Sequence, residues 1–192
     1  PIISDPNLFS DLIEKISEYP FFKESDAIIA IDARGFIFGS AVAKTIKKPL
    51  ILARKKNKLP GLVCEKTYGL EYGKDSLCIQ KSSILPFHKF VIIDDLLATG
   101  GTAKCVIDML KNNNKDVLAL SVIVQLSFLK GAESLGISLL SRVRVGYLVS
   151  VRPFSDALER LEEGFPISKG SILGFSVGKT YSLSLNIQAQ KD

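Results

Sequence analysis

Two adjacent carboxylates, Asp94 and Asp95, stand just before a run of small residues that could hold an anion. The run is Ala98-Thr99-Gly100-Gly101-Thr102, in which glycines allow backbone N–H groups to approach a phosphate closely. Carboxylates repel phosphate, but their oxygens accept hydrogen bonds from the hydroxyl groups of a ribose. Two acids beside an anion cradle therefore predict a sugar phosphate as ligand, and not a phosphate alone.

A strand and a helix must frame this segment if it is to bind phosphate. The apolar residues 90–93 predict a buried strand, whereas Ala103, Val106, Ile107 and Leu110 recur at helical spacing. A helix that begins after such a loop adds its free N–H groups and its dipole to the cradle. The segment lacks the Lys of a Walker A loop and the spacing of a dinucleotide fingerprint. The alternative interpretation is an ordinary strand-turn-helix unit with an acidic turn and no ligand.

A second unit of the same kind places an arginine at its turn. Residues 26–32 predict the first buried strand, and a helix is expected from about residue 39 to residue 47. Ala33 and Arg34 lie in the loop between them. A guanidinium group beside free N–H groups suits a pyrophosphate, since it can donate two parallel hydrogen bonds. The alternative interpretation is that Arg34 is a solvent-exposed residue of a turn and binds no ligand.

A basic loop and a hairpin separate these two units. Four cations occur within residues 54–58, which indicates either an anion-collecting flap or a solvated loop. Strand-like segments at 66–72 and 76–80 flank a hairpin turn at 72–75. Glu71 lies at this turn, where by itself it would be an ordinary exposed glutamate.

These segments, taken in order, resemble those of the type I phosphoribosyltransferases, and among them the adenine phosphoribosyltransferases. The similarity covers about residues 1–140 and rests on residues 32–39, 54–61, 68–74, 94–102 and 126–131. It implies an α/β fold with a mainly parallel sheet, flanking helices and a β-hairpin catalytic flap. It also implies a role in purine salvage. The phosphoribosyl group of phosphoribosyl pyrophosphate (PRPP) would pass to adenine, giving AMP and pyrophosphate.

The resemblance assigns a role to each motif. Three catalytic residues are expected: Arg34 at the pyrophosphate, Glu71 for the purine N7 proton, and Tyr72 for closing the flap. Asp94 and Asp95 would hold the ribose hydroxyls in their ionised form. The residues expected to bind substrate are Ala33, Arg54, Lys58, Asp94, Asp95, Ala98, Thr99, Gly100, Gly101, Thr102 and Leu126. Mg²⁺ is expected on the oxygens of PRPP and on water, without a metal site built by the protein.

Composition narrows the class of protein further. The 192 residues fit one domain, and a net charge of +5 suits an anionic ligand but is too modest to indicate nucleic acid. Three cysteines, an odd number without metal-binding spacing, favour the reducing cytoplasm. The single histidine, His88, argues against catalytic triads and His-rich metal sites. No apolar run approaches the ~18 residues of a membrane helix. The resemblance further implies a homodimer acting on small-molecule substrates.

Both ends differ from the family pattern. The N-terminal segment that forms a hood over the purine is expected to be missing, and Gln125 stands where an acid is common. Residues 141–192 are predicted to form an atypical C-terminal extension with strands near 142–152 and 180–187 and a helix at 155–164. The glycines at 174–178 suggest a hairpin turn, since their spacing does not match a P-loop. These differences leave two alternatives open: another purine substrate, or a PRPP-binding protein with a regulatory or inactive role.

Overall fold

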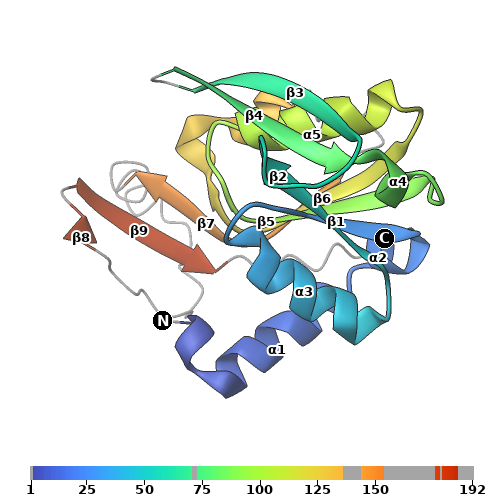
Figure 1. The fold of residues 1–192 in the computed structure, drawn as a ribbon. Helices are drawn as coiled ribbons and strands as arrows, with labels where there is room; N and C mark the ends of the chain where they lie inside the picture. The colour runs from blue at the N-terminus through green and yellow to red at the C-terminus, as the bar shows by residue number, and fades with distance from the viewer. Residues whose placement is uncertain (1, 71–72, 136–143, 154–175, 178, 186–192) are drawn as a thin grey trace.

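The computed structural model describes residues 2–70, 73–135, 144–153, 176–177 and 179–185. Within these residues one sheet has the strand order β3-β4-β2-β1-β5-β6-β7-β9-β8 (Figure 1). Its strands are β1 Ala27–Ile31, β2 Leu50–Lys55, β3 Val63–Leu70, β4 Gly73–Gln80, β5 Lys89–Leu97, β6 Asp116–Leu126, β7 Arg144–Pro153, β8 Ser176–Val177 and β9 Lys179–Leu185. The helices are α1 Pro6–Ser17, α2 Pro20–Glu24, α3 Gly35–Ile46, α4 Lys81–Ile84, α5 Gly101–Asn112 and α6 Gly131–Ser134, with short 3₁₀ turns η1 Ile2–Ser4 and η2 Ser127–Leu129.

The centre of the sheet is parallel, as the sequence predicts. β1 pairs in parallel with β2 and β5, and β6 pairs in parallel with β5 and β7. All five residues of β1 are buried, which explains why the strand reads as a continuous apolar run. The carboxyl ends of β1 and β5 therefore meet at one edge of the sheet, where parallel α/β proteins bind their ligands.

Helices cover both faces of the sheet (Figure 1). On one face α1, α2 and α3 enclose a core that includes Phe22, Phe38 and Val42. On the other face α5 contributes Val106 and Leu110 to a second core. Each of the longer helices presents an apolar side to the sheet, and burial of these side chains drives the layers together. Among the described helices, none is long and apolar enough to cross a membrane.

The predicted hairpin flap is present and continues the sheet. β3 pairs antiparallel with β4 up to Leu70 and Gly73, and β4 pairs with the end of β2. The base of the flap is fastened to α5, since Lys66 forms a 2.8 Å ion pair with Asp108 and the Cys105 thiol donates to the Lys66 carbonyl. Glu71 and Tyr72, at the tip, lie outside the described residues.

Two helices begin earlier than the sequence pattern indicates. α3 starts at Gly35 and not near residue 39, because its first turn packs directly on β5: an added Cβ at Gly35 would lie 3.0 Å from the Ile93 carbonyl oxygen. α5 likewise starts at Gly101, two residues before its apolar periodicity begins. Both loops are therefore shorter than predicted, and both helix N-termini lie closer to the strand ends.

The strands predicted in the C-terminal segment are present in the described part of it. β7 adds to β6 in parallel, and β9 pairs antiparallel with β7, so both continue the same sheet. β8 and β9 pair antiparallel, in agreement with a hairpin in place of a P-loop, and Gly178 between them lies outside the described residues. The helix predicted at 155–164 lies outside the described residues, and the domain division near residue 140 stays a prediction.

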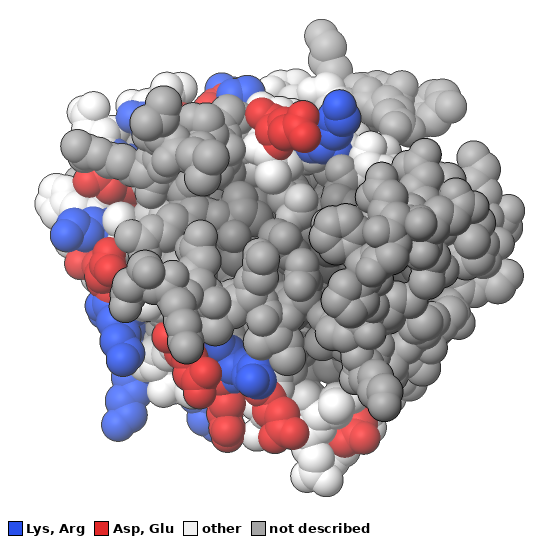
Figure 2. Space-filling model, turned by 180° about the vertical axis from the view of Figure 1, so that it is seen from behind, with Lys and Arg blue, Asp and Glu red and all other residues white. Residues whose placement is uncertain are grey.

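On the opposite face of the molecule, cationic and anionic side chains of the described residues are interspersed (Figure 2).

Candidate active site

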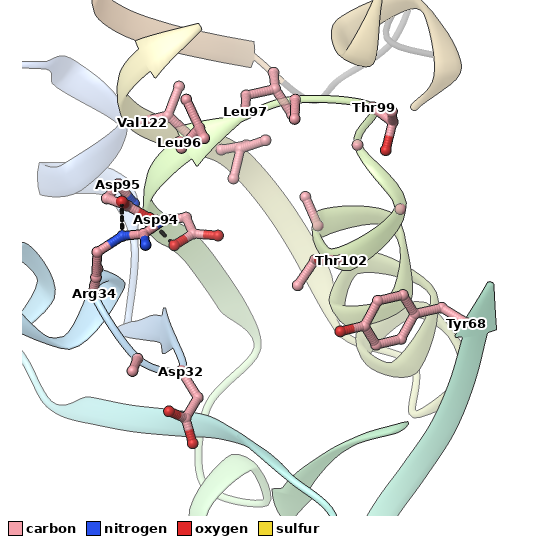
Figure 3. Close-up of a pocket in the computed structure, with 16 residues that line it drawn as sticks. Asp32, Arg34, Tyr68, Asp94, Asp95, Leu96, Leu97, Thr99, Thr102 and Val122 are labelled. Carbon is pink, nitrogen blue, oxygen red and sulfur yellow. Dashed lines mark hydrogen bonds and ion pairs between the residues drawn. The ribbon is translucent and has the colours of Figure 1, made fainter. Parts of the chain in front are cut away.

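A cavity of about 330 Å³ opens at the carboxyl ends of β1 and β5. It brings together two segments that the sequence assigned to one ligand, although some sixty residues separate them along the chain. The predicted site residues that line it are Ala33, Arg34, Asp94, Asp95, Ala98, Thr99, Gly100, Gly101 and Thr102. The loop after β1 and the loop after β5 therefore line one shared space (Figure 3).

The loop between β5 and α5 has the form of an anion cradle. Gly100 has a φ of +87°, a left-handed conformation that favours glycine, and α5 begins immediately after it. Helix α6 supports the loop from behind, where the Ser134 hydroxyl donates to the Thr99 carbonyl at 2.6 Å. An added Cβ at Gly131 would lie only 2.1 Å from the Ala98 carbonyl oxygen. Sequence patterns did not predict this support by Gly131 and Ser134. Its only sequence signal is a Lys-Gly pair at the start of a short helix.

The two carboxylates differ in their surroundings. Asp94 is largely buried, and its Oδ1 accepts a 2.9 Å hydrogen bond from the backbone N–H of Asp95. Burial, strengthened by the neighbouring Asp95 charge, raises the pKa of Asp94 to about 7. Burial thus opposes ionisation of Asp94 in the ligand-free protein, while the hydrogen bond from the Asp95 N–H and the charge of Arg34 favour it. That both carboxylates hold ribose hydroxyls in ionised form stays a prediction.

Arg34 and Asp95 lie in contact on one side of the cavity (Figure 3). The Arg34 Nε donates to the Asp95 carboxylate, and this ion pair raises the pKa of Arg34 (Figure 3). The Arg34 side chain remains 69% exposed, so most of its guanidinium can still meet a ligand. The start of α3 and the end of β5 thus place a cation beside the two carboxylates of the cavity.

Three of the predicted substrate residues do not line the cavity. Arg54 instead donates to Asp32 at 3.2 Å and to the Lys58 carbonyl at 3.2 Å, with its guanidinium 5.8 Å from the centre of the Phe36 ring. Lys58 contributes a backbone acceptor to this arrangement. Leu126 packs against the core on the α1–α3 face of the sheet. A charge run in the sequence cannot show that one of its cations is already paired within the fold.

Tyr68 also lines the cavity, although no local sequence pattern marks it as a site residue. It belongs to β3, and its ring extends from the flap toward the cavity (Figure 3). Burial raises the pKa of its hydroxyl, and an interaction with the Thr102 side chain opposes that rise. The alternation of side chains along β3 directs Tyr68 toward α5, a signal visible only once the partner of that face is known.

We expect Asp94→Asn to remove a pH dependence from the stability of the protein. Folding raises the Asp94 pKa from 3.8 to about 7, so the folded state binds the extra proton between these values. The contribution of Asp94 to the free energy of unfolding must therefore decrease as pH rises from about 4 to about 7. Urea unfolding at pH 5 and pH 8 checks this: the wild type should lose stability relative to Asp94→Asn at the higher pH. Parallel pH profiles for the two proteins would contradict the burial of an acid at this position.

Comparison with known proteins identifies the family of this chain. Residues 6–134 match the model of the phosphoribosyl transferase domain. An adenine phosphoribosyltransferase of Prochlorococcus marinus (strain MIT 9215) is 49% identical over 144 residues, which are 75% of this chain and 84% of that protein. The adenine phosphoribosyltransferase of Mycoplasmopsis pulmonis is 43% identical over 136 residues, covering 71% of this chain and 79% of the relative.

Solved structures agree with this result. The adenine phosphoribosyltransferase of Thermoanaerobacter pseudethanolicus has a TM-score of 0.68 and 34% identity, covering 75% of this chain and 84% of its own. The enzyme of Saccharomyces cerevisiae, solved with an imino-altritol bisphosphate and adenine, has a TM-score of 0.65 and 33% identity, covering 74% and 81%. With the cavity, the loop sequences and these similarities in agreement, the chain belongs to the phosphoribosyltransferase family and, within it, to the adenine phosphoribosyltransferases.

Proposed function

We propose that this protein transfers the phosphoribosyl group of PRPP to adenine, giving AMP and pyrophosphate in purine salvage. One observation carries the proposal: a single cavity combines an anion cradle at residues 98–102 with the acids Asp94 and Asp95 and the cation Arg34. This set matches the parts of PRPP, which are a 5-phosphate, ribose hydroxyls and a pyrophosphate. The adenine bound to the yeast relative and the names of the bacterial relatives favour adenine over hypoxanthine or xanthine.

The reaction requires the protein to stabilise developing charge and to position the reacting groups. As the bond from ribose C1 to pyrophosphate breaks, positive charge develops on the sugar and negative charge on the leaving group. Asp94 and Asp95 would accept hydrogen bonds from the ribose hydroxyls, which favours the ionised form of Asp94. Their negative charge then lies near the developing positive charge. Glu71, at the tip of the flap, is the proposed group that moves the N7 proton of the purine, with Tyr72 supporting closure.

Arg34 is the proposed contact of the leaving pyrophosphate. We expect Arg34→Ala to weaken the binding of pyrophosphate and PRPP by about tenfold or more, because it removes a charge-assisted contact worth about 1.5–3 kcal/mol. AMP lacks the pyrophosphate group, so its affinity should change far less. Calorimetric titration of the three ligands measures the difference, with Lys58→Ala as a matched loss of a nearby cation that does not line the cavity. Equal losses for PRPP and AMP would contradict this assignment.

The residues of the cavity fit Mg²⁺ held largely by the substrate. Asp32, Asp94 and Asp95 supply hard carboxylate oxygens, but the described residues contain no cluster of three or more His, Cys, Asp or Glu that could hold a metal ion. We propose that these carboxylates meet the ion through water while PRPP supplies most of its ligands. When bound, Mg²⁺ neutralises part of the charge on the pyrophosphate.

Two properties of the protein as a whole complete the proposal. We propose a cytoplasmic enzyme, supported by Cys64, Cys78 and Cys105, which are all buried free thiols. We also propose a homodimer, for which the exposed Leu8 and Ile37 on the neighbouring helices α1 and α3 offer apolar surface. Light scattering of the purified protein measures the oligomeric state.

An assay with PRPP, Mg²⁺ and a panel of purines tests the function. We expect adenine to be consumed with equimolar release of pyrophosphate, and hypoxanthine, xanthine and guanine to react at least about tenfold more slowly, because a buried polar group left unpaired costs about 1–3 kcal/mol. Preference for another purine would overturn the substrate assignment. PRPP binding without turnover of any purine would favour the regulatory alternative.

A further inference from the structure

Tyr68 lies where the flap meets the start of α5. A side-chain carbon of Tyr68 is 3.9 Å, and the Gly69 carbonyl oxygen 3.6 Å, from the position of an added Cβ on Gly101. β3 therefore runs across the helix N-terminus that ends the phosphate cradle. The Tyr68 ring enters the cavity from this side, opposite the side from which Arg34 and Asp32 approach (Figure 3).

The position of Tyr68 is set by contacts made without a ligand. Two residues before it, Lys66 is held to α5 by its ion pair with Asp108 and by the Cys105 thiol. The ring of Tyr68 also packs against the core beneath α5. The place of Tyr68 beside the cradle is therefore set by the base of the flap and does not depend on closure of the flap.

The chemistry of the Tyr68 hydroxyl suits a phosphate oxygen. Partial burial raises its pKa, so the phenol keeps its proton and can donate a hydrogen bond. Its neighbour Thr102 is one of the residues of the cradle. Near the Tyr68 hydroxyl, Lys55 and Asp75 form a 2.9 Å ion pair with each other. The Asp75 carboxylate is therefore already paired and does not compete strongly for the Tyr68 hydrogen.

We propose that the Tyr68 hydroxyl donates a hydrogen bond to the 5-phosphate of the substrate, as a ligand that the flap adds to the cradle at residues 98–102. The loop and the N-terminus of α5 then surround the phosphate on one side, and Tyr68 completes its shell on the other. The inference rests on the proposed function, since it takes the 5-phosphate to lie in this cradle.

Titration of Tyr68→Phe with ligands that carry or lack the 5-phosphate tests the proposal. A hydrogen bond to a charged group predicts about tenfold or more weaker binding of AMP and ribose 5-phosphate. Binding of pyrophosphate with Mg²⁺ should stay within about twofold of wild type, since that ligand does not reach the cradle. In steady-state assays the KM for PRPP should rise more than kcat falls. Tyr19→Phe, which removes a hydroxyl from the region of α1 and α2, is the matched control and should leave all these values unchanged.

The outcomes separate this inference from the proposed function. Unchanged AMP and ribose 5-phosphate affinities in Tyr68→Phe, with normal thermal unfolding, would overturn the Tyr68 contact while an active wild type upholds the function. An equal loss for pyrophosphate would also overturn it, because the hydroxyl would then face the other anion or act through the fold alone. If wild-type protein itself fails to bind ribose 5-phosphate, the proposed function falls with the inference. Tyr68→Leu, which removes the ring as well, should weaken AMP at least as much as Tyr68→Phe does.

Discussion

Replacing Glu71 with glutamine is expected to lower kcat by about 100- to 10,000-fold, the usual contribution of a general acid or base. Glutamine keeps the shape of the side chain but cannot take or give a proton. The affinity for PRPP should hardly change, because the flap tip acts on bound substrate and not on its capture. Single-turnover measurements of AMP formation, together with PRPP titrations, separate the two effects.

A matched substitution is available on the same flap. Glu65→Gln removes a carboxylate that pairs with Lys56 at 2.7 Å near the base of β3, well away from the tip. We expect this control to change kcat by less than about threefold, because an exposed ion pair contributes little. If Glu71→Gln behaves like the control while adenine binds normally, Glu71 is a solvated hairpin residue and another group moves the proton.

The second large effect is expected from Gly131→Ala, a residue that does not line the cavity. Its new Cβ would lie 2.1 Å from the Ala98 carbonyl oxygen, so either α6 or the cradle must move. A displacement of about 1 Å at a binding loop can reduce catalysis by about 100-fold. We therefore expect kcat/KM for PRPP to fall by about that factor, mostly through a higher KM.

Stability and site geometry must be measured separately in this variant. Overpacking costs about 1–3 kcal/mol, so a lower thermal midpoint is expected as well. AMP titration of the folded protein isolates the effect on the cradle. Glu133→Ala, an exposed change in the same short helix, should leave both stability and binding near wild type. Normal AMP affinity in Gly131→Ala would show that α6 yields and that the cradle does not depend on it.

The contiguous parts of this site could be predicted because their signals are local. The buried strand before Asp94, the small residues after it and the helical periodicity beyond them all lie within about twenty residues. Their side-chain pattern reflects burial on a sheet, so β5 and α5 follow from it. Asp5 is a similar local case: it stands just before Pro6 and caps α1 by accepting hydrogen bonds from the N–H groups of Asn7 and Leu8.

Other features depended on which elements meet in space. The sequence pattern does not reveal that Arg54 is paired with Asp32, that Gly131 supports Ala98, or that Tyr68 enters the cavity. Each of these contacts joins residues that lie on separate elements, and hydrophobic periodicity shows only that a face is buried, not what covers it. Long-range packing also decides the electrostatics, since burial of Asp94 raises its pKa to about 7. The sequence alone thus determined the family, the parallel sheet and the two loops that line the cavity. The tertiary structure decided which charged groups are free to meet the substrate, because burial and pairing arise only when distant segments pack together.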